Sequence, residues 1–166
     1  MTLKNHLLEN TETFIAKINE FTDSQFNIKP DSDSWSAANV LEHMYRSEFG
    51  IPRLFTGETR QLTDRQPDAY LPDMKKRFLE SDAKMQASGV ILPTEGEKTK
   101  ESLIEKFHSN RNKIAKLIDE LPQEELCLKF KHPVFGYLTR MEWTHFSIIH
   151  SQRHLKQLER IQSQIQ

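Results

Sequence analysis

Apolar residues recur at helical spacing in four stretches of the chain, and polar segments separate these stretches. The first stretch runs from Leu3 to Phe21, where Leu7, Phe14 and Ile18 mark one face. A repeat of three or four residues places such side chains on one side of an α-helix. The segment "NIKPDSDSW" then interrupts the pattern with a proline and several Asp and Ser residues.

The second and third helices are predicted from their start signals and periodicity. Ser36 is suited to capping a helix N-terminus, and the helix after it runs to about Arg46. The third helix follows Thr99, and one polar residue, Asn110, interrupts its apolar seam. Pro122 ends this helix, because proline commonly follows a helix C-terminus.

The fourth helix begins at Thr139, which has Glu142 three residues later, the spacing of a capping box. It continues to the end of the chain. The preceding segment, "LCLKFKHPVFGYL", is rich in residues that favour strands, so we expect an extended segment or a small hairpin there.

A long connection of roughly residues 56–98 separates the second and third helices. Pro72 opens a predicted short helix at about 74–79, and Pro52 is expected to lie past the end of the second helix or to kink it. Four amphipathic helices with one long crossover predict an all-α four-helix bundle. The length of 166 residues fits a single domain over residues 1–166.

Composition narrows the class of partner. The formal net charge is −1, and Lys and Arg are spread along the chain, so we expect neither nucleic acid nor a membrane surface as partner. Cys127 is the only cysteine, which excludes an internal disulfide. The stretch "MTLKNHLLENTETF" has no apolar run typical of a signal peptide, so we expect a cytoplasmic protein.

Two histidines fall on the face of the fourth helix that should enter the core. At 100° per residue, His150 and His154 share a narrow stripe with Trp143, Leu158 and Ile161. Their i, i+4 spacing lets the two rings converge. A buried imidazole without partners costs about 1–3 kcal/mol, and a divalent metal would accept the lone pairs of both rings.

A third histidine, His43, borders the apolar face of the second helix beside Val40 and Ser47. The three rings could therefore form one metal site. Hydrogen bonds to core carboxylates or water are the alternative explanation for the two histidines of the fourth helix. The remaining histidines are expected not to be ligands: His6 and His108 exposed, His132 in a turn, and His145 opposite the core stripe. No HExxH motif is present, and no Glu stands three residues before His43, His150 or His154, which excludes a zincin or di-iron site at these histidines.

Ile148 and Ile149 lie away from the histidine stripe and would form an apolar patch on the last helix. A homodimer would cover such a patch. Cover by the long connection of the same chain is the competing explanation.

Two segments, "WSAANVLEHMYRSE" and "HPVFGYLTRMEWTHFSIIHSQRHLKQL", resemble the DinB-like (YfiT-like) superfamily. The specific parts are W-S-x-x-x-V-L-E-H, H-P-x-F-G-x-L-T-x-x-E-W and H-x-x-x-H-x-x-Q. The resemblance implies a four-helix bundle with non-sequential helix order. It also implies a metal triad at His43, His150 and His154. Many relatives carry a histidine where this chain has Arg153.

The resemblance also implies a class of chemistry, because some members are thiol-dependent transferases or isomerases that use bacillithiol, mycothiol or glutathione. The first hypothesis is therefore a transferase in which one divalent metal ion, zinc or nickel, activates a small thiol for attack on an electrophile. Metal-dependent hydrolysis and a non-catalytic metal-binding bundle are the alternatives. Gln157 is expected to support a ligand from a second layer. Asn110 either does the same or is a core asparagine that fixes the register of the helices.

Overall fold

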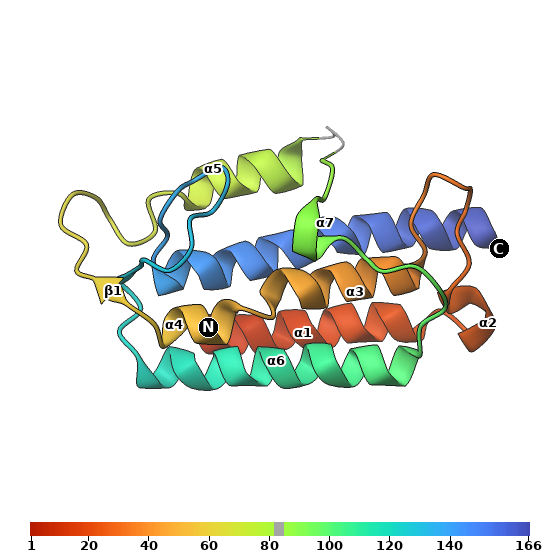
Figure 1. The fold of residues 1–166 in the computed structure, drawn as a ribbon, viewed down its shortest axis with the longest axis horizontal. Helices are drawn as coiled ribbons and strands as arrows, with labels where there is room; N and C mark the ends of the chain where they lie inside the picture. The colour runs from red at the N-terminus through yellow and green to blue at the C-terminus, as the bar shows by residue number, and fades with distance from the viewer. Residues whose placement is uncertain (82–84) are drawn as a thin grey trace.

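The computed structural model describes residues 1–81 and 85–166, and four long helices form a bundle (Figure 1). α1 and α7 run in one direction, and α3 and α6 run in the opposite direction. α1 packs against α6 and α7, and α3 packs against the same two helices, so neighbours in the bundle do not follow sequence order. The predicted four-helix bundle is confirmed. Its helices are α1 (Leu3–Asn19), α3 (Ala37–Glu48), α6 (Lys100–Glu120) and α7 (Arg140–Ile165).

The parallel direction of α3 and α6 explains the long crossover. The chain leaves α3 at one end of the bundle and must return to the other end before α6 begins (Figure 1). The 21 residues of α6 span about 30 Å, which a short turn cannot cover. The crossover carries α4 (Ile51–Phe55), β1 (Thr59–Arg60), α5 (Leu71–Lys75), the π-helix η1 (Lys76–Glu80) and the 3₁₀-helix η2 (Gly89–Ile91).

Two expectations about prolines are refined by the structure. Pro72 does open a short helix, but α5 starts at Leu71 and continues through η1. Pro52 lies past the end of α3, which is one of the two expected outcomes, and it does not kink that helix. It lies in the first turn of α4, where a missing N–H costs nothing.

The extended segment before α7 is present, and its partner lies in the crossover. β2 (Leu126–Cys127) pairs antiparallel with β1, with Thr59 opposite Cys127. The short helix α2 (Asp23–Phe26) was not predicted, although Thr22 and Gln25 form a capping box there.

A polar layer divides the core into two apolar halves. One half contains Leu7, Ile114 and Trp143, and the other contains Phe14, Phe107 and Leu158. Between these levels all four long helices bring polar side chains into the interior, and all of them are buried. They are Asn10, Thr11, His43, Glu48, Asn110, Arg111, Ser147, His150, Ser151 and His154.

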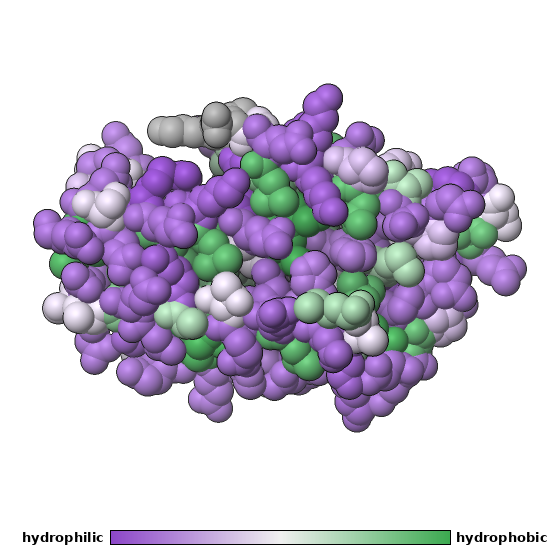
Figure 2. Space-filling model, turned by 180° about the vertical axis from the view of Figure 1, so that it is seen from behind, coloured by the Kyte–Doolittle hydropathy of each residue, from purple (hydrophilic) through white to green (hydrophobic). Residues whose placement is uncertain are grey.

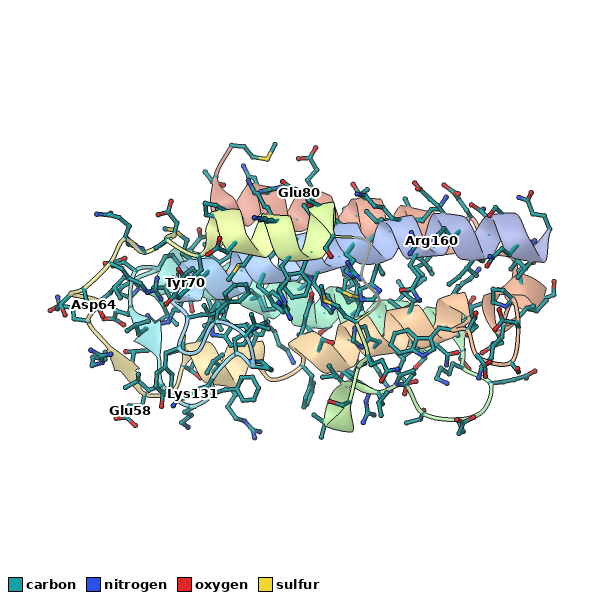
Figure 3. All side chains as sticks on the ribbon, turned by 90° about the horizontal axis from the view of Figure 1, so that it is seen from above. Glu58, Asp64, Tyr70, Glu80, Lys131 and Arg160 are labelled. Carbon is teal, nitrogen blue, oxygen red and sulfur yellow. The ribbon has the colours of Figure 1, made fainter. Side chains whose placement is uncertain are left out.

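The surface is mainly hydrophilic, with smaller hydrophobic areas on the face seen in Figure 2. Figure 3 shows one end of the molecule, near β1, with the labelled side chains of Glu58, Asp64 and Lys131. Arg160 lies toward the other end, on α7. None of the helices among the described residues has the length and apolar character that crossing a bilayer requires.

Ile148 and Ile149 do not form a surface patch. They are 1% and 2% exposed and belong to the apolar core half that includes Met74 and Phe78 of the crossover. Cover within the chain, the competing explanation, accounts for both side chains. The homodimer stays a prediction that has lost this support.

Candidate metal centre

Two capped helices carry the three core histidines. Ser36 accepts the Asn39 N–H, and the Asn39 side chain accepts the Ser36 N–H, which fixes the start of α3 two turns before His43. α7 starts at the predicted Thr139–Glu142 capping box. His43, His150 and His154 are then at most 8% exposed.

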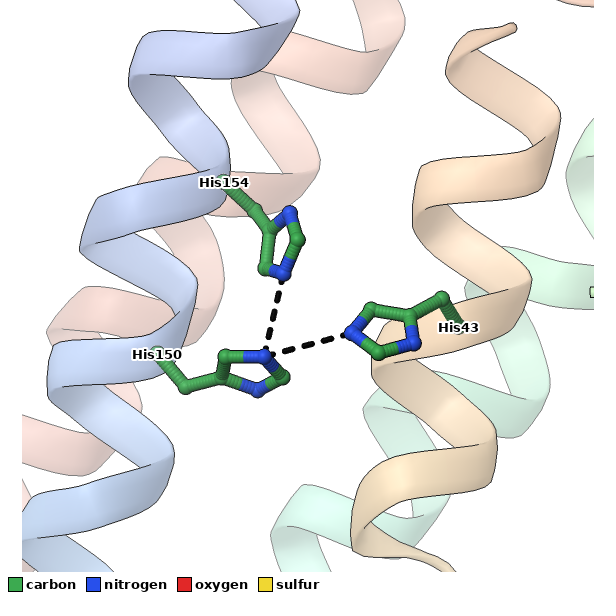
Figure 4. Close-up of side chains that lie close together, drawn as sticks. All are labelled: His43, His150 and His154. Atoms are coloured by element: carbon green, nitrogen blue, oxygen red, sulfur yellow. Dashed lines mark hydrogen bonds between the residues drawn. The ribbon is translucent and has the colours of Figure 1, made fainter. Parts of the chain in front are cut away.

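The three rings point at one another (Figure 4). His150 Nε2 lies 3.2 Å from His43 Nε2 and 3.0 Å from His154 Nε2. The three ligand atoms lie within 4.8 Å of one another. In a tetrahedral site with zinc–nitrogen distances of 2.0–2.1 Å, neighbouring nitrogens are about 3.3–3.4 Å apart. The two distances from His150 are therefore close to what one small ion requires.

Hydrogen bonds at the far side of two rings fix their protonation. His43 Nδ1 lies 2.9 Å from the carbonyl oxygen of Ile91, and His154 Nδ1 lies 2.7 Å from Gln157 Oε1. An oxygen of this kind can only accept, so both Nδ1 atoms carry the proton. Each neutral ring then presents the lone pair of Nε2 to the centre, which is the arrangement a metal ligand needs.

The cluster is short of protons for its own hydrogen bonds. Because two of the three Nε2 atoms present lone pairs, His150 Nε2 can supply at most one proton between them. His150 Nδ1 is buried and has no hydrogen-bond partner among the residues described. Three converging nitrogens share at most one proton, so some of their buried lone pairs have no hydrogen-bond donor, which costs stability. A bound cation would accept these lone pairs.

Burial keeps the three rings neutral. It lowers the pKa of His154 to about 3 and the pKa of His150 well below 6.5. Burial also lowers the pKa of His43, although the hydrogen bond to Ile91 opposes the shift. Neutral imidazoles are the form that binds metal.

The crossover is fastened over α3 beside the cluster. Glu42 accepts hydrogen bonds from the backbone N–H and the hydroxyl of Thr94, at 2.9 and 2.7 Å, and forms an ion pair with Lys98. Arg46 Nε donates to the carbonyl of Val90. These contacts set the position of the Ile91 carbonyl that orients His43.

A cavity of about 440 Å³ lies between the start of α3 and residues 92–97, and none of the three histidines lines it. Trp35 lines this cavity and also contacts the histidines. Its ring centroid is 5.0 Å from that of His43, and it stacks on His154 at 6.5 Å with an interplanar angle of 15°. A molecule in the cavity would therefore lie against the residue that packs on two of the three rings.

The family model for the DinB superfamily matches residues 6–158. The chain belongs to the DinB superfamily. The uncharacterized protein YuaE of Bacillus subtilis (strain 168) is 25% identical over 149 residues, which cover 87% of this chain and 88% of YuaE.

A solved structure supports the same fold. It is that of YfiT from Bacillus subtilis, described as a probable metal-dependent hydrolase with an unusual four-helix bundle topology. The TM-score is 0.57 at 16% identity, and the alignment covers 96% of this chain and 86% of YfiT. At this identity the likeness shows the shared fold.

Of the two residues expected to support the metal ligands, one contacts a histidine of the cluster and the other contacts the backbone of α3. Gln157 Oε1 lies 2.7 Å from His154 Nδ1. Asn110 does not support a histidine in this way: its amide donates to the backbone carbonyl of Glu48 at 2.9 Å. The alternative role, a core asparagine that links two helices, describes it better.

Sequence reasoning missed the buried ion pair next to Asn110. Arg111 is fully buried, and its Nε and Nη2 atoms each lie 2.6 Å from a carboxylate oxygen of Glu48. Nη1 donates to Asn10, and Nη2 also donates to the Ser147 carbonyl. A clue was present in the sequence, because polar residues interrupt the apolar faces of all four long helices at positions that pack at the same height in the bundle.

The other histidines lie outside the cluster, and His6 and His108, which were expected to be exposed, are half-buried. His132 is buried, because its ring packs among Phe135, Trp143 and Phe146. Its pKa falls to about 4 through burial. His6 is half-buried, since its ring centroid lies 6.4 Å from that of His145.

Proposed function

We propose that this chain is a metal-dependent enzyme in which His43, His150 and His154 bind one divalent ion. The observation that carries the proposal is the convergence of three neutral imidazole nitrogens, two of them fixed as acceptors by hydrogen bonds to Ile91 and Gln157. Imidazole ligands suit zinc and nickel, which we propose as the resident metals.

Three protein ligands favour catalysis over a structural role. Structural zinc sites are closed by four protein ligands, whereas catalytic sites keep a position for water or substrate. The three histidines form a group without a carboxylate or thiolate among the described residues. The cavity lined by Trp35 supports the same view, because a substrate there would lie against the side chain that packs on His43 and His154.

The nucleophile must come from outside the chain. Cys127 is buried, and burial raises the pKa of its thiol to about 11. Glu42 is engaged by Thr94 and Lys98, and Glu48 by Arg111, so neither carboxylate of α3 is available as a general base. A divalent ion supplies this function by lowering the pKa of a thiol or water bound beside it.

A small thiol is our first candidate for that nucleophile, with an electrophile such as a haloaromatic or an epoxide as acceptor. A thiol of pKa about 8.5 needs only a modest shift to ionise at neutral pH, so it requires no protein base. The chain's part is to hold the ion, orient His43 and His154, and limit access of bulk water. Hydrolysis is the second candidate, because YfiT is described as a probable metal-dependent hydrolase.

Thiol-dependent turnover tests the first candidate. Protein purified without a histidine tag is assayed with bacillithiol, mycothiol, glutathione and coenzyme A, before and after metal removal. We expect transfer only with metal present, and none in His150→Ala. His108→Ala is the matched control, because His108 lies on α6 with 43% of its side chain exposed and should not affect turnover.

Two results would contradict the proposal. Turnover that survives metal removal would exclude a role for the ion. Metal-dependent ester or amide hydrolysis without any thiol transfer would replace the first candidate with the second.

A further inference from the structure

His150 is held differently from the other two rings of the cluster. His43 and His154 are each oriented by an Nδ1 hydrogen bond, whereas His150 Nδ1 is buried without a partner among the described residues. Histidines that bind metals almost always donate their second N–H to an oxygen, which fixes the ring. Some other contact must therefore orient His150.

That contact is an aromatic stack. Phe146 lies one turn before His150 on α7, and the two rings are nearly parallel, at 13°, with centroids 5.3 Å apart. A ring lying flat against an imidazole restricts rotation about the Cβ–Cγ bond, which is the motion that would swing Nε2 away from the other nitrogens.

Three further rings hold Phe146 in place. His132, Phe78 and Trp143 each present an edge to it, at centroid distances of 4.6, 5.3 and 6.0 Å and angles of 75–88°. Edge-to-face contacts are the favoured geometry for aromatic pairs. They come from three parts of the chain: the turn before α7, η1, and α7 itself.

The turn that carries His132 is built to fix this ring. His132 Nδ1 accepts the backbone N–H groups of Val134 and Phe135 at 3.1 and 3.4 Å. His132 and Gly136 exchange two backbone hydrogen bonds, of 2.8 and 2.9 Å, and Gly136 has a φ of +76°, which favours glycine. The H-P-V-F-G motif thus closes a rigid turn around the His132 ring.

We propose that Phe146 is a positioning residue for His150, supported by the His132 turn, and that this stack replaces the missing Nδ1 hydrogen bond. This inference rests on the proposed function, because it concerns one of the three proposed ligands. It assigns a role to the H-P-V-F-G motif, whose His132 contacts Phe146 and also Phe78, and both of these rings contact His150.

Three variants test the proposal. Phe146→Leu removes the flat ring, and Phe146→Tyr keeps it. Phe14→Leu is the matched control, because Phe14 packs against Phe107 in the other apolar half of the core. Zinc affinity is measured for each variant by competition with a chromophoric chelator, and folding is checked by urea unfolding.

We expect Phe146→Leu to weaken zinc binding about tenfold, the lower end of the effect of removing a supporting contact from a metal ligand. Phe146→Tyr should bind zinc as the wild type does. Phe14→Leu should lose stability without losing affinity. Equal zinc affinity in Phe146→Leu and wild type would overturn the proposal, and so would an equal loss in Phe14→Leu.

A second measurement works without metal and separates this inference from the proposed function. A ring stacked on Phe146 shifts the carbon-bound protons of His150 upfield in the NMR spectrum of the metal-free protein. We expect this shift in wild type and Phe146→Tyr and its loss in Phe146→Leu. If wild type binds no metal, the proposed function fails. The inference also fails if the His150 shifts are the same in Phe146→Leu and wild type.

Discussion

Replacing Arg111 alone should lower the unfolding free energy of the bundle more than replacing Arg111 and Glu48 together. Both side chains are buried, and the guanidinium binds the carboxylate through two 2.6 Å contacts. Arg111→Met leaves the carboxylate buried without its partner, and Glu48→Leu does the same to the guanidinium. The double variant removes both charges.

The structure sets the expected magnitudes. Each single replacement should cost about 3–5 kcal/mol of unfolding free energy, so independent effects would sum to about 6–10 kcal/mol. In the double variant Asn10 keeps its hydrogen bond from Ser151, and the Ser147 carbonyl, inside α7, keeps its helical N–H donor when it loses Arg111. Imperfect packing then suggests a loss of about 1–3 kcal/mol. The coupling should therefore be about 5–7 kcal/mol.

Urea unfolding of the four proteins, followed by circular dichroism, measures these free energies. A loss in the double variant equal to the sum of the two single losses would refute the reasoning, because it would mean that the charges do not compensate each other.

The pH dependence of Arg111→Met provides a second check. Burial raises the pKa of Glu48, and the guanidinium opposes this rise. Without Arg111 the folded state should hold a proton on Glu48 that the unfolded state releases at neutral pH. Stability then rises as pH falls, so the deficit of the variant should shrink between about pH 7 and pH 5. A deficit that stays constant over this range would contradict the assignment.

Other predictions concern the thiol and the start of α7. Cys127, buried with a thiol pKa raised to about 11, should react with Ellman's reagent only as fast as the protein unfolds, and rapid labelling of the native state would contradict its placement. Glu142→Ala should lower the unfolding free energy by about 2–4 kcal/mol, because it removes part of the capping box and the carboxylate to which the Arg65 guanidinium donates. The exposed Glu159→Ala is its control, with an expected change within about 0.5 kcal/mol. Amide hydrogen exchange should also accelerate near Arg65 in Glu142→Ala but not in the control.

Periodicity and helix caps were sufficient to predict the four long helices. Ser36 and Thr139 begin α3 and α7 as predicted, because a cap depends on residues within one turn. The apolar residues Leu7, Phe14 and Ile18 are all fully buried, since their face was defined by local spacing alone. The same spacing identified the three histidines that the structure brings together.

Features that depend on distant partners were not predictable in this way. Arg111 is typical of a solvent-facing position until Glu48, 63 residues away, is placed beside it. His132 is buried only because Trp143 and Phe146 enclose it. The β1–β2 pair has two residues in each strand, which is too short for an alternating pattern to reveal.

Metal stoichiometry tests the central claim most directly. Zinc and nickel are titrated into metal-free, untagged protein by calorimetry, for wild type and for the single Ala variants of His43, His150 and His154, with His108→Ala as control. We predict one ion bound for each wild-type or His108→Ala chain, and at least a hundredfold weaker binding in the other three, about 2.7 kcal/mol. Wild-type protein that binds neither ion, or a His43→Ala, His150→Ala or His154→Ala variant that binds as tightly as wild type, would contradict the claim.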